Sequence, residues 1–247
     1  MSGVVHILQY NRHYYLAGLS VLLGLLILLR LDLFPAPSRP LLLAGIALVA
    51  FWWIGSLAAS YYVYDYAGVT RWGWLPATLA FPPRQWLNLH AGLDESSEAL
   101  TRLFPESKGQ ALDIYDPVTM TETSIARARR SHPPAEAAAP AKLGALPLDQ
   151  CSRDTVFLLL AAHEVRRADR RVELFREAAR VMIESGQLLM VEHLRDWKNF
   201  LAFGPGFLHF HAHGEWLRVA RESGFSLESE GRVTPLVHWF LLRKTGS

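Results

Sequence analysis

Two long runs without a charged residue dominate the first 63 residues of the chain. The first covers 14–29, "YYLAGLSVLLGLLILL", and the second covers 41–63. A membrane-spanning helix needs about 20 consecutive, mainly apolar residues. The second run has that length by itself, and the first reaches it when it is extended to Leu33. Because the Pro-rich break "FPAPSRP" separates the two runs, we predict a helical hairpin that anchors the chain in a membrane.

Two other interpretations of the apolar runs were weighed against the hairpin. A cleaved signal peptide would end at a small-residue cleavage site, and no such site stands between the runs. Two buried core helices are the remaining alternative. Aromatic side chains favour the headgroup zone, and tyrosines gather at the predicted ends of the hairpin: Tyr10, Tyr14, Tyr15, Tyr61, Tyr62, Tyr64 and Tyr66. Arginines flank both sides, so charge does not decide the orientation.

The composition limits the compartment and the partners. Hydrophobic residues make up 51% of the chain, more than is usual for a soluble protein. The net charge is +2, and "RARR" at 127–130 is interpreted as a solvated helix end, so no nucleic-acid partner is expected. Cys151 is the only cysteine, which excludes an internal disulfide and is compatible with a reducing compartment. We therefore expect an integral membrane protein whose globular part lies in the cytoplasm.

From residue 84 onward, short apolar runs alternate with helix-period segments, a pattern typical of a mostly parallel sheet with helices on both faces. The predicted strands are 85–90, 109–116, 154–162 and 187–194, and the predicted helices are 96–104, 121–130, 170–186 and 214–225. Any strand within 131–148 is short or absent. Residues 225–244 contain two successive strand-like segments, which predicts an antiparallel hairpin at one edge of the sheet.

One predicted helix ends at a glycine. Leu174, Phe175, Ala178 and Met182 share one face of the segment 170–186, and Gly186 closes it. The predicted organisation of the whole chain is a membrane hairpin at 1–66, an interfacial linker at 67–83 and an α/β domain at 84–247.

This order of elements resembles the class I S-adenosylmethionine-dependent methyltransferases over about residues 84–244. The stretches that carry the resemblance are "WLNLHAGLDESSEALTRLFP", "ALDIYDPVTM", "GALPLDQCSRDTVFLLLAAHEV" and "FREAARVMIESGQLLMVEHL". The resemblance implies a Rossmann-like fold, S-adenosylmethionine as the cofactor and methyl transfer as the reaction. An acid that the family often has near the adenine is not evident before Leu146 and Pro147.

The loop after the first strand departs from the family's pattern. Family members usually have an acidic residue there, followed by three alternate glycines. In this chain Asn88 stands at the position of the acidic residue, and His90, Gly92 and Asp94 stand at the positions of the glycines. Asn88 forms hydrogen bonds but cannot neutralise an ammonium group. One glycine can still allow a close approach of the backbone to a ligand. The alternative is a domain that keeps the fold and has lost the ligand.

The second strand ends in an acid that favours a retained cofactor. Asp113 follows Gly92 by 21 residues, where a carboxylate can bind both hydroxyls of a ribose. Asp116 competes for this role, and a strand-end residue exposed to water is the structural alternative. The residues to which we assign cofactor binding are Asn88, His90, Ala91, Gly92, Asp113 and Ile114.

The ends of the last two parallel strands carry His163 with Glu164 and Glu192 with His193. Ligands of open parallel sheets bind outside the carboxyl ends of the strands, so these side chains are expected near an active site. A neutral histidine there can take a proton from a substrate hydroxyl. We predict His163, Glu164 and His193 as catalytic residues. Capping or salt bridging is the alternative for one of each pair.

The segment "HFHAHGEW" carries three alternate histidines, His209, His211 and His213. On an extended segment they could share a face and hold a metal. No cysteine or compact carboxylate set accompanies them, so we predict no metal site. We interpret the aromatic, glycine-containing stretch 200–213 as a lid over the site.

These observations favour a membrane-anchored S-adenosylmethionine-dependent methyltransferase. The hairpin keeps the enzyme at the bilayer, where lipophilic acceptors are concentrated. The expected partners are a lipophilic small-molecule acceptor and membrane lipid, and the sequence predicts no oligomeric state. The alternative is a non-catalytic, membrane-tethered interaction protein with a degenerate methyltransferase fold.

Overall fold

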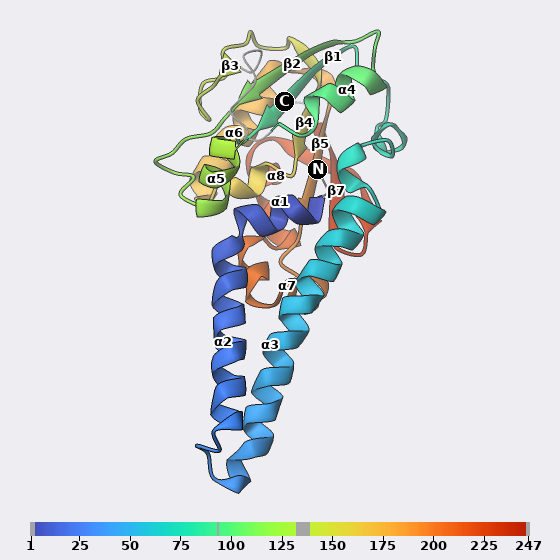
Figure 1. Ribbon diagram of the computed structural model, residues 1–247. Helices are drawn as coiled ribbons and strands as arrows, with labels where there is room; N and C mark the ends of the chain where they lie inside the picture. Colours follow the sequence, from blue (N-terminus) through green and yellow to red (C-terminus); the bar gives the residue numbers. More distant parts are fainter. Residues whose placement is uncertain (1–2, 93, 132–138, 246–247) are drawn as a thin grey trace.

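A long helical hairpin is joined to an α/β domain, as Figure 1 shows. The computed structural model describes residues 3–92, 94–131 and 139–245. The hairpin consists of α2 (Arg12–Arg30) and α3 (Arg39–Ser60), with the short 3-10 turn η1 (Ala36–Ser38) at its far end. A short helix, α1 (Gly3–Tyr10), precedes α2, and α3 continues into the π-helical turn η2 (Tyr61–Tyr66).

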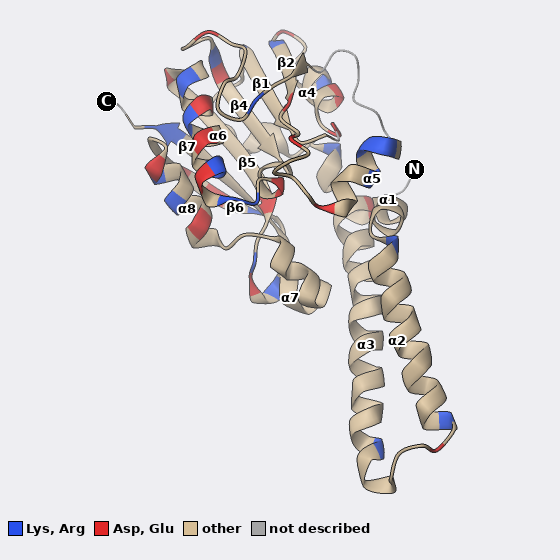
Figure 2. Ribbon diagram, turned by 90° about the vertical axis from the view of Figure 1, so that its left-hand side faces the viewer, with Lys and Arg blue, Asp and Glu red and all other residues tan. Residues whose placement is uncertain are grey.

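The two hairpin helices project away from the sheet. Leucine and alanine are strong helix formers, and Pro40 lies in the first turn of α3, where its missing N–H costs nothing. Both helices are long and apolar enough to cross a membrane, and their apolar windows are not buried inside the described part of the protein. Figure 2 shows no charged residue along either helix between its ends. The alternative of two buried core helices is therefore wrong.

The α/β domain is built on a seven-stranded sheet in the order β3-β2-β1-β4-β5-β7-β6. Strands β1 to β5 are parallel, and β7 is antiparallel to both of its neighbours. This confirms the mostly parallel sheet with an antiparallel edge hairpin. The strand bounds are β1 (Gln85–His90), β2 (Lys108–Asp113), β3 (Ala139–Pro140), β4 (Arg153–Leu159), β5 (Met182–His193), β6 (Phe225–Thr234) and β7 (Val237–Lys244).

Helices and 3-10 turns connect the strands and cover the sheet. The α-helices are α4 (Ser97–Leu103), α5 (Thr123–Ser131), α6 (Ala168–Val181), α7 (Trp197–Phe203) and α8 (His213–Glu222). The 3-10 turns are η3 (Val69–Arg71), η4 (Leu75–Thr78), η5 (Ala162–Glu164) and η6 (Gly204–His209).

Alternate residues of the buried strands face two different hydrophobic clusters. In β4, Val156 and Leu158 pack in the cluster that includes α6 and α8, whereas Phe157 and Leu159 pack in the one that includes α4. The continuous apolar sequence of β4 is thereby explained, because a strand covered on both faces has no polar side.

Four predicted boundaries in this domain are wrong: the strand predicted for 154–162 stops at Leu159, the helix predicted for 214–225 ends at Glu222, and two further elements also end early. The helix predicted for 170–186 ends at Val181, and Met182 already begins β5, where it pairs with Arg153 of β4. Between these residues and the pair Thr155–Gln187 the register shifts by a bulge, so the strand starts before the glycine that was interpreted as a helix end. The strand predicted for 109–116 stops at Asp113. Its side chain accepts a hydrogen bond from the backbone of Tyr115 and turns the chain.

The segment 67–83, predicted as a linker, packs under the sheet. Val69, Trp72 and Leu75 are buried and belong to the same cluster as α4. Val63 of η2 is fully buried in that cluster too. The hairpin therefore enters the hydrophobic core of the α/β domain directly.

Candidate active site

The predicted site residues lie at the carboxyl ends of the parallel strands. β1 neighbours β2 on one side and β4 on the other, so the direction of the crossovers reverses next to β1, and ligands of open α/β sheets bind at such a point. We divide the region into two parts. The β1–β2 half comprises residues 88–92, 94–97, 113–115 and Arg129. The β4–β5 half comprises residues 163–164, 192–193 and 209–211.

In the β1–β2 half, the loop after β1 is held by its own side chains. Asn88 is fully buried, and its amide donates hydrogen bonds to the hydroxyls of Ser96 (2.9 Å) and Ser97 (2.8 Å). One oxygen of Asp94 accepts hydrogen bonds from the backbone N–H groups of both serines. Asn88 therefore fixes the loop at the start of α4. The side-chain oxygen of Asn88, Oδ1, has no hydrogen-bond partner in the described structure.

His90 is the register partner of Asp113 and is 3% exposed. Neither of its ring nitrogens has a hydrogen-bond partner among the described residues. Burial lowers the pKa of His90, although Asp94 and Asp113 oppose that shift. A neutral imidazole with two unsatisfied nitrogens thus stands beside the carboxylate that was predicted to bind a ribose.

Gly92 and Asp113 both contact Arg129, which comes from α5. Gly92 has a φ of +96°, and a Cβ at this position would lie 2.8 Å from the Arg129 side chain. The guanidinium also binds the Asp113 carboxylate at 2.5 Å and lies over the ring of Tyr115. Glycine is required at such a φ. The backbone at Gly92 therefore does allow a close approach, and the side chain of Arg129 fills the space in which a ligand would lie.

Ala91 and Ile114, the other two predicted cofactor residues, have their side chains in the core. The backbone N–H of Ile114 donates to the carbonyl of His90. Only the backbones of these two residues are left to contact a ligand.

In the β4–β5 half, His163 and Glu192 form a close pair. Nδ1 of His163 lies 2.6 Å from Glu192, whose second carboxylate oxygen accepts the backbone N–H of His163 at 3.1 Å. Nε2 of His163 lies 3.5 Å from Glu164. Burial alone would lower the pKa of His163, but the carboxylates of Glu192 and Glu164 raise it to about 10. The imidazole is therefore protonated at neutral pH.

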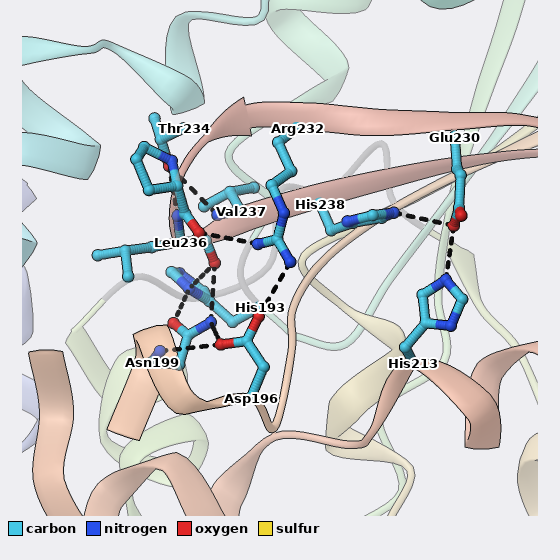
Figure 3. A network of polar contacts seen from close by, with 11 residues as sticks. His193, Asp196, Asn199, His213, Glu230, Arg232, Thr234, Leu236, Val237 and His238 are labelled. Carbon is cyan, nitrogen blue, oxygen red and sulfur yellow. Dashed lines mark hydrogen bonds and ion pairs between the residues drawn. The ribbon is translucent and has the colours of Figure 1, made fainter. Parts of the chain in front are cut away.

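His193, at the end of β5, is enclosed by a different set of partners. Figure 3 shows it beside Asn199 and the backbone of Leu236. Its Nδ1 donates toward the Leu236 carbonyl (3.0 Å) and the Asn199 amide oxygen (3.2 Å), and Nε2 accepts from the Tyr64 hydroxyl (2.9 Å). Burial lowers the pKa of His193 to about 4. This histidine is neutral, and both nitrogens are already used.

The network around His193 continues to the edge hairpin. Asp196 caps the start of α7 by accepting the N–H of Asn199 and also pairs with Arg232 of β6 at 3.0 Å (Figure 3). His193 thus connects β5, α7 and the turn η2 at the end of the helical hairpin, and the ring of Phe210 stacks on it at 4.8 Å.

The three alternate histidines do not share a face. His209 lies near Glu122, Glu164 and His163, whereas His211 is buried against Arg171. His213 binds Glu230, which also binds His238 (Figure 3). A metal bound by all three is therefore excluded. Two groups have converging ligand atoms, His163–Glu164–His209 and His213–Glu230–His238, and in each group both histidines lie within ion-pair distance of the glutamate.

Comparisons with known proteins bear on the fold. No model of a protein family matches the chain, and no curated protein sequence matches it either. Solved methyltransferase structures do match. For the mitomycin 7-O-methyltransferase MmcR, the identity is 16% and the TM-score 0.52, over 82% of this chain and 58% of MmcR. For the pyocyanin biosynthetic protein PhzM, they are 16% and 0.53, over 85% of this chain and 68% of PhzM.

The PH0226 protein from Pyrococcus horikoshii OT3 matches at 14% identity with a TM-score of 0.54, over 74% of this chain and 91% of that protein. The chain has the fold of a class I methyltransferase. It spans well under two thirds of the length of MmcR.

S-adenosylmethionine fits the β1–β2 half on one condition. A buried carboxylate stands at the end of β2, a glycine of positive φ stands after β1, and His90 offers two unsatisfied nitrogens. Arg129 occupies the space between the first two. The residues present therefore fit the cofactor once the side chain of Arg129, which reaches in from α5, has turned away.

Three residues that shape the site have no role in it in the sequence-based predictions. Arg129 lies in "RARR", which was interpreted as a solvated helix end, and its distance of 16 residues from Asp113 gives no signal for a pair. Glu192 was noted at a strand end but not assigned a role. Tyr64 was interpreted as a headgroup anchor, and its bond to His193 spans 129 residues.

Proposed function

We propose that the chain is a membrane-anchored S-adenosylmethionine-dependent methyltransferase with a lipophilic acceptor. The observation that carries the proposal is the placement of a buried carboxylate, Asp113, beside the positive-φ Gly92, with the His163–Glu192 pair on the same edge of the sheet. The first pair suits a nucleoside and the second suits proton transfer.

The β1–β2 half would hold the cofactor. Asp113 would accept the ribose hydroxyls, the backbone at Gly92 would approach the ligand, and His90 would supply a hydrogen bond from an otherwise unsatisfied nitrogen. When bound, S-adenosylmethionine supplies an electrophilic methyl group on a sulfonium. The protein then contributes proximity and alignment.

The β4–β5 half would handle the proton of the acceptor. Glu192 fixes the Nδ1–H of His163, which leaves Nε2 as the atom that exchanges a proton, as in other histidine–carboxylate pairs. His163 must first lose its proton to act as a base. Glu164, within 3.5 Å of Nε2, is the neighbouring group that can share that proton. His193 positions α7 and the hairpin, because neither of its nitrogens is free.

The membrane part of the proposal rests on α2 and α3. Their length, apolar surface and lack of burial suit a bilayer, and each exposes large side chains such as Leu23 and Ile54 along its length. The globular domain would lie in the cytoplasm, where S-adenosylmethionine is made and where the single Cys151 stays reduced. An acceptor dissolved in the same membrane would be concentrated near the site.

The experiment that tests this function is calorimetric titration of the full chain in detergent with S-adenosylmethionine and S-adenosylhomocysteine. We expect saturable binding of both. Adenosine triphosphate serves as the control ligand, because a site without an anion cradle should not take it. Failure of both methionine-derived ligands to bind would refute a methyltransferase.

A second function is favoured by one observation, the occupation of the Gly92–Asp113 space by Arg129. If this arginine belongs there permanently, the domain is a non-catalytic, membrane-tethered docking module. Replacement of Arg129 by alanine distinguishes the two functions. An enzyme binds cofactor before and after the replacement, whereas a docking module does not bind it while Arg129 is present.

A further inference from the structure

The segment formed by α7 and η6 exposes an unusual amount of apolar surface. Beyond residue 66, six large apolar side chains of the described residues are exposed, and four of them lie here: Trp197, Phe200, Leu201 and Leu208. No Asp, Glu, Lys or Arg occurs between Lys198 and Glu215. Monomeric soluble proteins rarely gather exposed apolar residues in this way.

The same segment lies against the membrane hairpin. Trp52 of α3 donates a hydrogen bond to the carbonyl of Phe200 at 3.2 Å, and the two rings meet edge to face at 5.3 Å. A Cβ on Gly204, at the start of η6, would lie 2.8 Å from the Trp52 ring. Figure 1 shows α7 beside the upper part of α3.

The position of Trp52 along α3 sets the level of this contact. Trp52 follows Arg39, at the far end of the hairpin, by 13 residues, which is about 20 Å of α-helix at a rise of 1.5 Å per residue. The hydrocarbon core is about 30 Å thick. With Arg39 at the far boundary, Trp52 lies about 10 Å inside the near boundary of the hydrocarbon core, a depth that apolar segments lying in the membrane interface reach.

A second contact of the hairpin gives the same level. Trp53 donates a hydrogen bond to the carbonyl of Tyr15 at 3.0 Å, so Tyr15 of α2 and Trp53 of α3 stand side by side. Aromatic side chains concentrate where hydrocarbon meets headgroups. Trp197 belongs to the same type of residue, and the ammonium of Lys198, 5.9 Å from its ring, suits the phosphates of lipid headgroups.

We propose that α7 and η6 form a lobe that inserts into the leaflet nearest the α/β domain, through the headgroup region and into the adjoining part of the hydrocarbon. This proposal rests on the membrane anchoring described above. The occupant of the apolar surface is lipid, because the surface is continuous with the lipid-facing surface of α3. η6 ends at His209, whose ring is 5.0 Å from that of His163, so the lobe leads from the bilayer to the β4–β5 half. The acceptor is then a molecule resident in that leaflet.

The test uses an environment-sensitive fluorophore on single cysteines in the full chain. Cys151, the only native cysteine, is first replaced by serine, and the label is attached to Leu201→Cys, Leu227→Cys or Leu48→Cys. Leu227 on β6 is the matched control, since it is 39% exposed against 48% for Leu201 and lies level with Leu188 in the middle of β5, away from the carboxyl end that leads to α7. Leu48, in the middle of α3, reports whether the hairpin spans the bilayer.

The proteins are reconstituted into phosphatidylcholine vesicles with a minor fraction of phosphatidylglycerol and nitroxide-labelled lipid. We expect the label at 201 to be blue-shifted and quenched severalfold more than the label at 227. Quenching at 48 without quenching at 201 would overturn the lobe and leave the anchor intact. Absence of quenching at both would overturn both. A blue-shifted label at 201 that lipid quenchers do not reach would indicate a protein partner and overturn the lobe.

Discussion

The two halves of the candidate active site are built differently. In the β4–β5 half most polar atoms are paired: Glu192 is fully buried against His163, His193 has three partners, and among its described carboxylate and imidazole atoms that are shielded from solvent Oε2 of Glu164 alone lacks a hydrogen bond. In the β1–β2 half, the decisive contact is one arginine from a short helix, while His90 and Asn88 keep unsatisfied atoms. Densely paired polar networks are rigid, whereas buried polar atoms without partners are candidates for contacts with a ligand.

This difference suggests how the halves divide the work. The β4–β5 half is already organised for proton transfer, so a change there should alter the rate. The β1–β2 half is closed by Arg129, so a change there should alter cofactor affinity. The following predictions test that division, from the largest effect to the smallest.

Replacement of His163 by alanine should lower turnover by about 10² to 10⁴, the usual contribution of a general base, with cofactor affinity little changed. The wild-type rate should rise about tenfold per pH unit toward pH 10, because the pKa of His163 is raised to about 10 and only the neutral form accepts a proton. The measurement is transfer of labelled methyl groups into a lipid extract across pH.

His213→Ala is the matched control for this experiment, since His213 also pairs with a glutamate, Glu230, but lies outside the site. It should keep the wild-type rate and pH profile. Equal rates for His163→Ala and wild type would mean that alignment alone carries the reaction.

Replacement of Asp113 by alanine should weaken cofactor binding by about 1.5 to 3 kcal/mol, the scale of hydrogen bonds to a charged group. Titration calorimetry measures it. Asp116→Ala is the control, because Asp116 caps its own turn through Val118 and Thr119 and should leave the affinity unchanged. The reverse result would transfer the ribose role to Asp116.

Replacement of Arg129 by alanine should tighten cofactor binding by about tenfold, or about 1.4 kcal/mol, because the cofactor no longer competes with the guanidinium for Asp113 and for the space over Gly92. Arg130→Ala, one residue along α5, is the control and should have no effect. Weaker binding in Arg129→Ala would show that this arginine contacts the ligand instead of excluding it.

The smallest effect is on stability, and its sign differs between the two histidines of the β4–β5 half. His163 has a folded pKa of about 10 against about 6.5 in an unfolded chain. The folded state holds the extra proton between these values, so the contribution of His163 is fully present below pH 6.5 and is lost as the pH rises toward 10.

His193 behaves in the opposite way, since its folded pKa is about 4. Its contribution is fully present above pH 6.5 and is lost as the pH falls toward 4. The thermal midpoint in detergent should therefore decline on both sides, and His163→Gln should remove part of the alkaline decline while it keeps the acid one. An alkaline decline identical to that of the wild type would contradict the assignment.

The sequence predicts the fold well because its signals are local and periodic. The apolar run of β4 and the edge hairpin of β6 and β7 follow from residues close in the chain. The start of β5 could not be predicted in the same way, since Met182 continues the helical spacing of α6 and only its pairing with Arg153 makes it a strand.

The site is less predictable, because its decisive contacts join distant residues. The positions of Asp113 and His163 at strand ends were predictable from the strand pattern. The occupation of the Gly92 space by Arg129 was not, since α5 has to fold back over the sheet to bring it there. The enclosure of His193 likewise depends on Tyr64, Asn199 and Leu236, which come from three separate segments.

The direct passage of α3 through η2 into the core has a consequence for how such a molecule searches for its partners. Val63 is fully buried, and Asp65 caps α1 through the N–H groups of Gly3 and Val4. The described residues between the helical hairpin and the sheet therefore form no flexible linker. A domain on a flexible tether explores a hemisphere above the bilayer. This domain, once anchored, would move only as the hairpin moves, at a constant height and in a plane. Its encounters would then depend on the number of partners per unit area of membrane and would be unaffected by the volume of the cell.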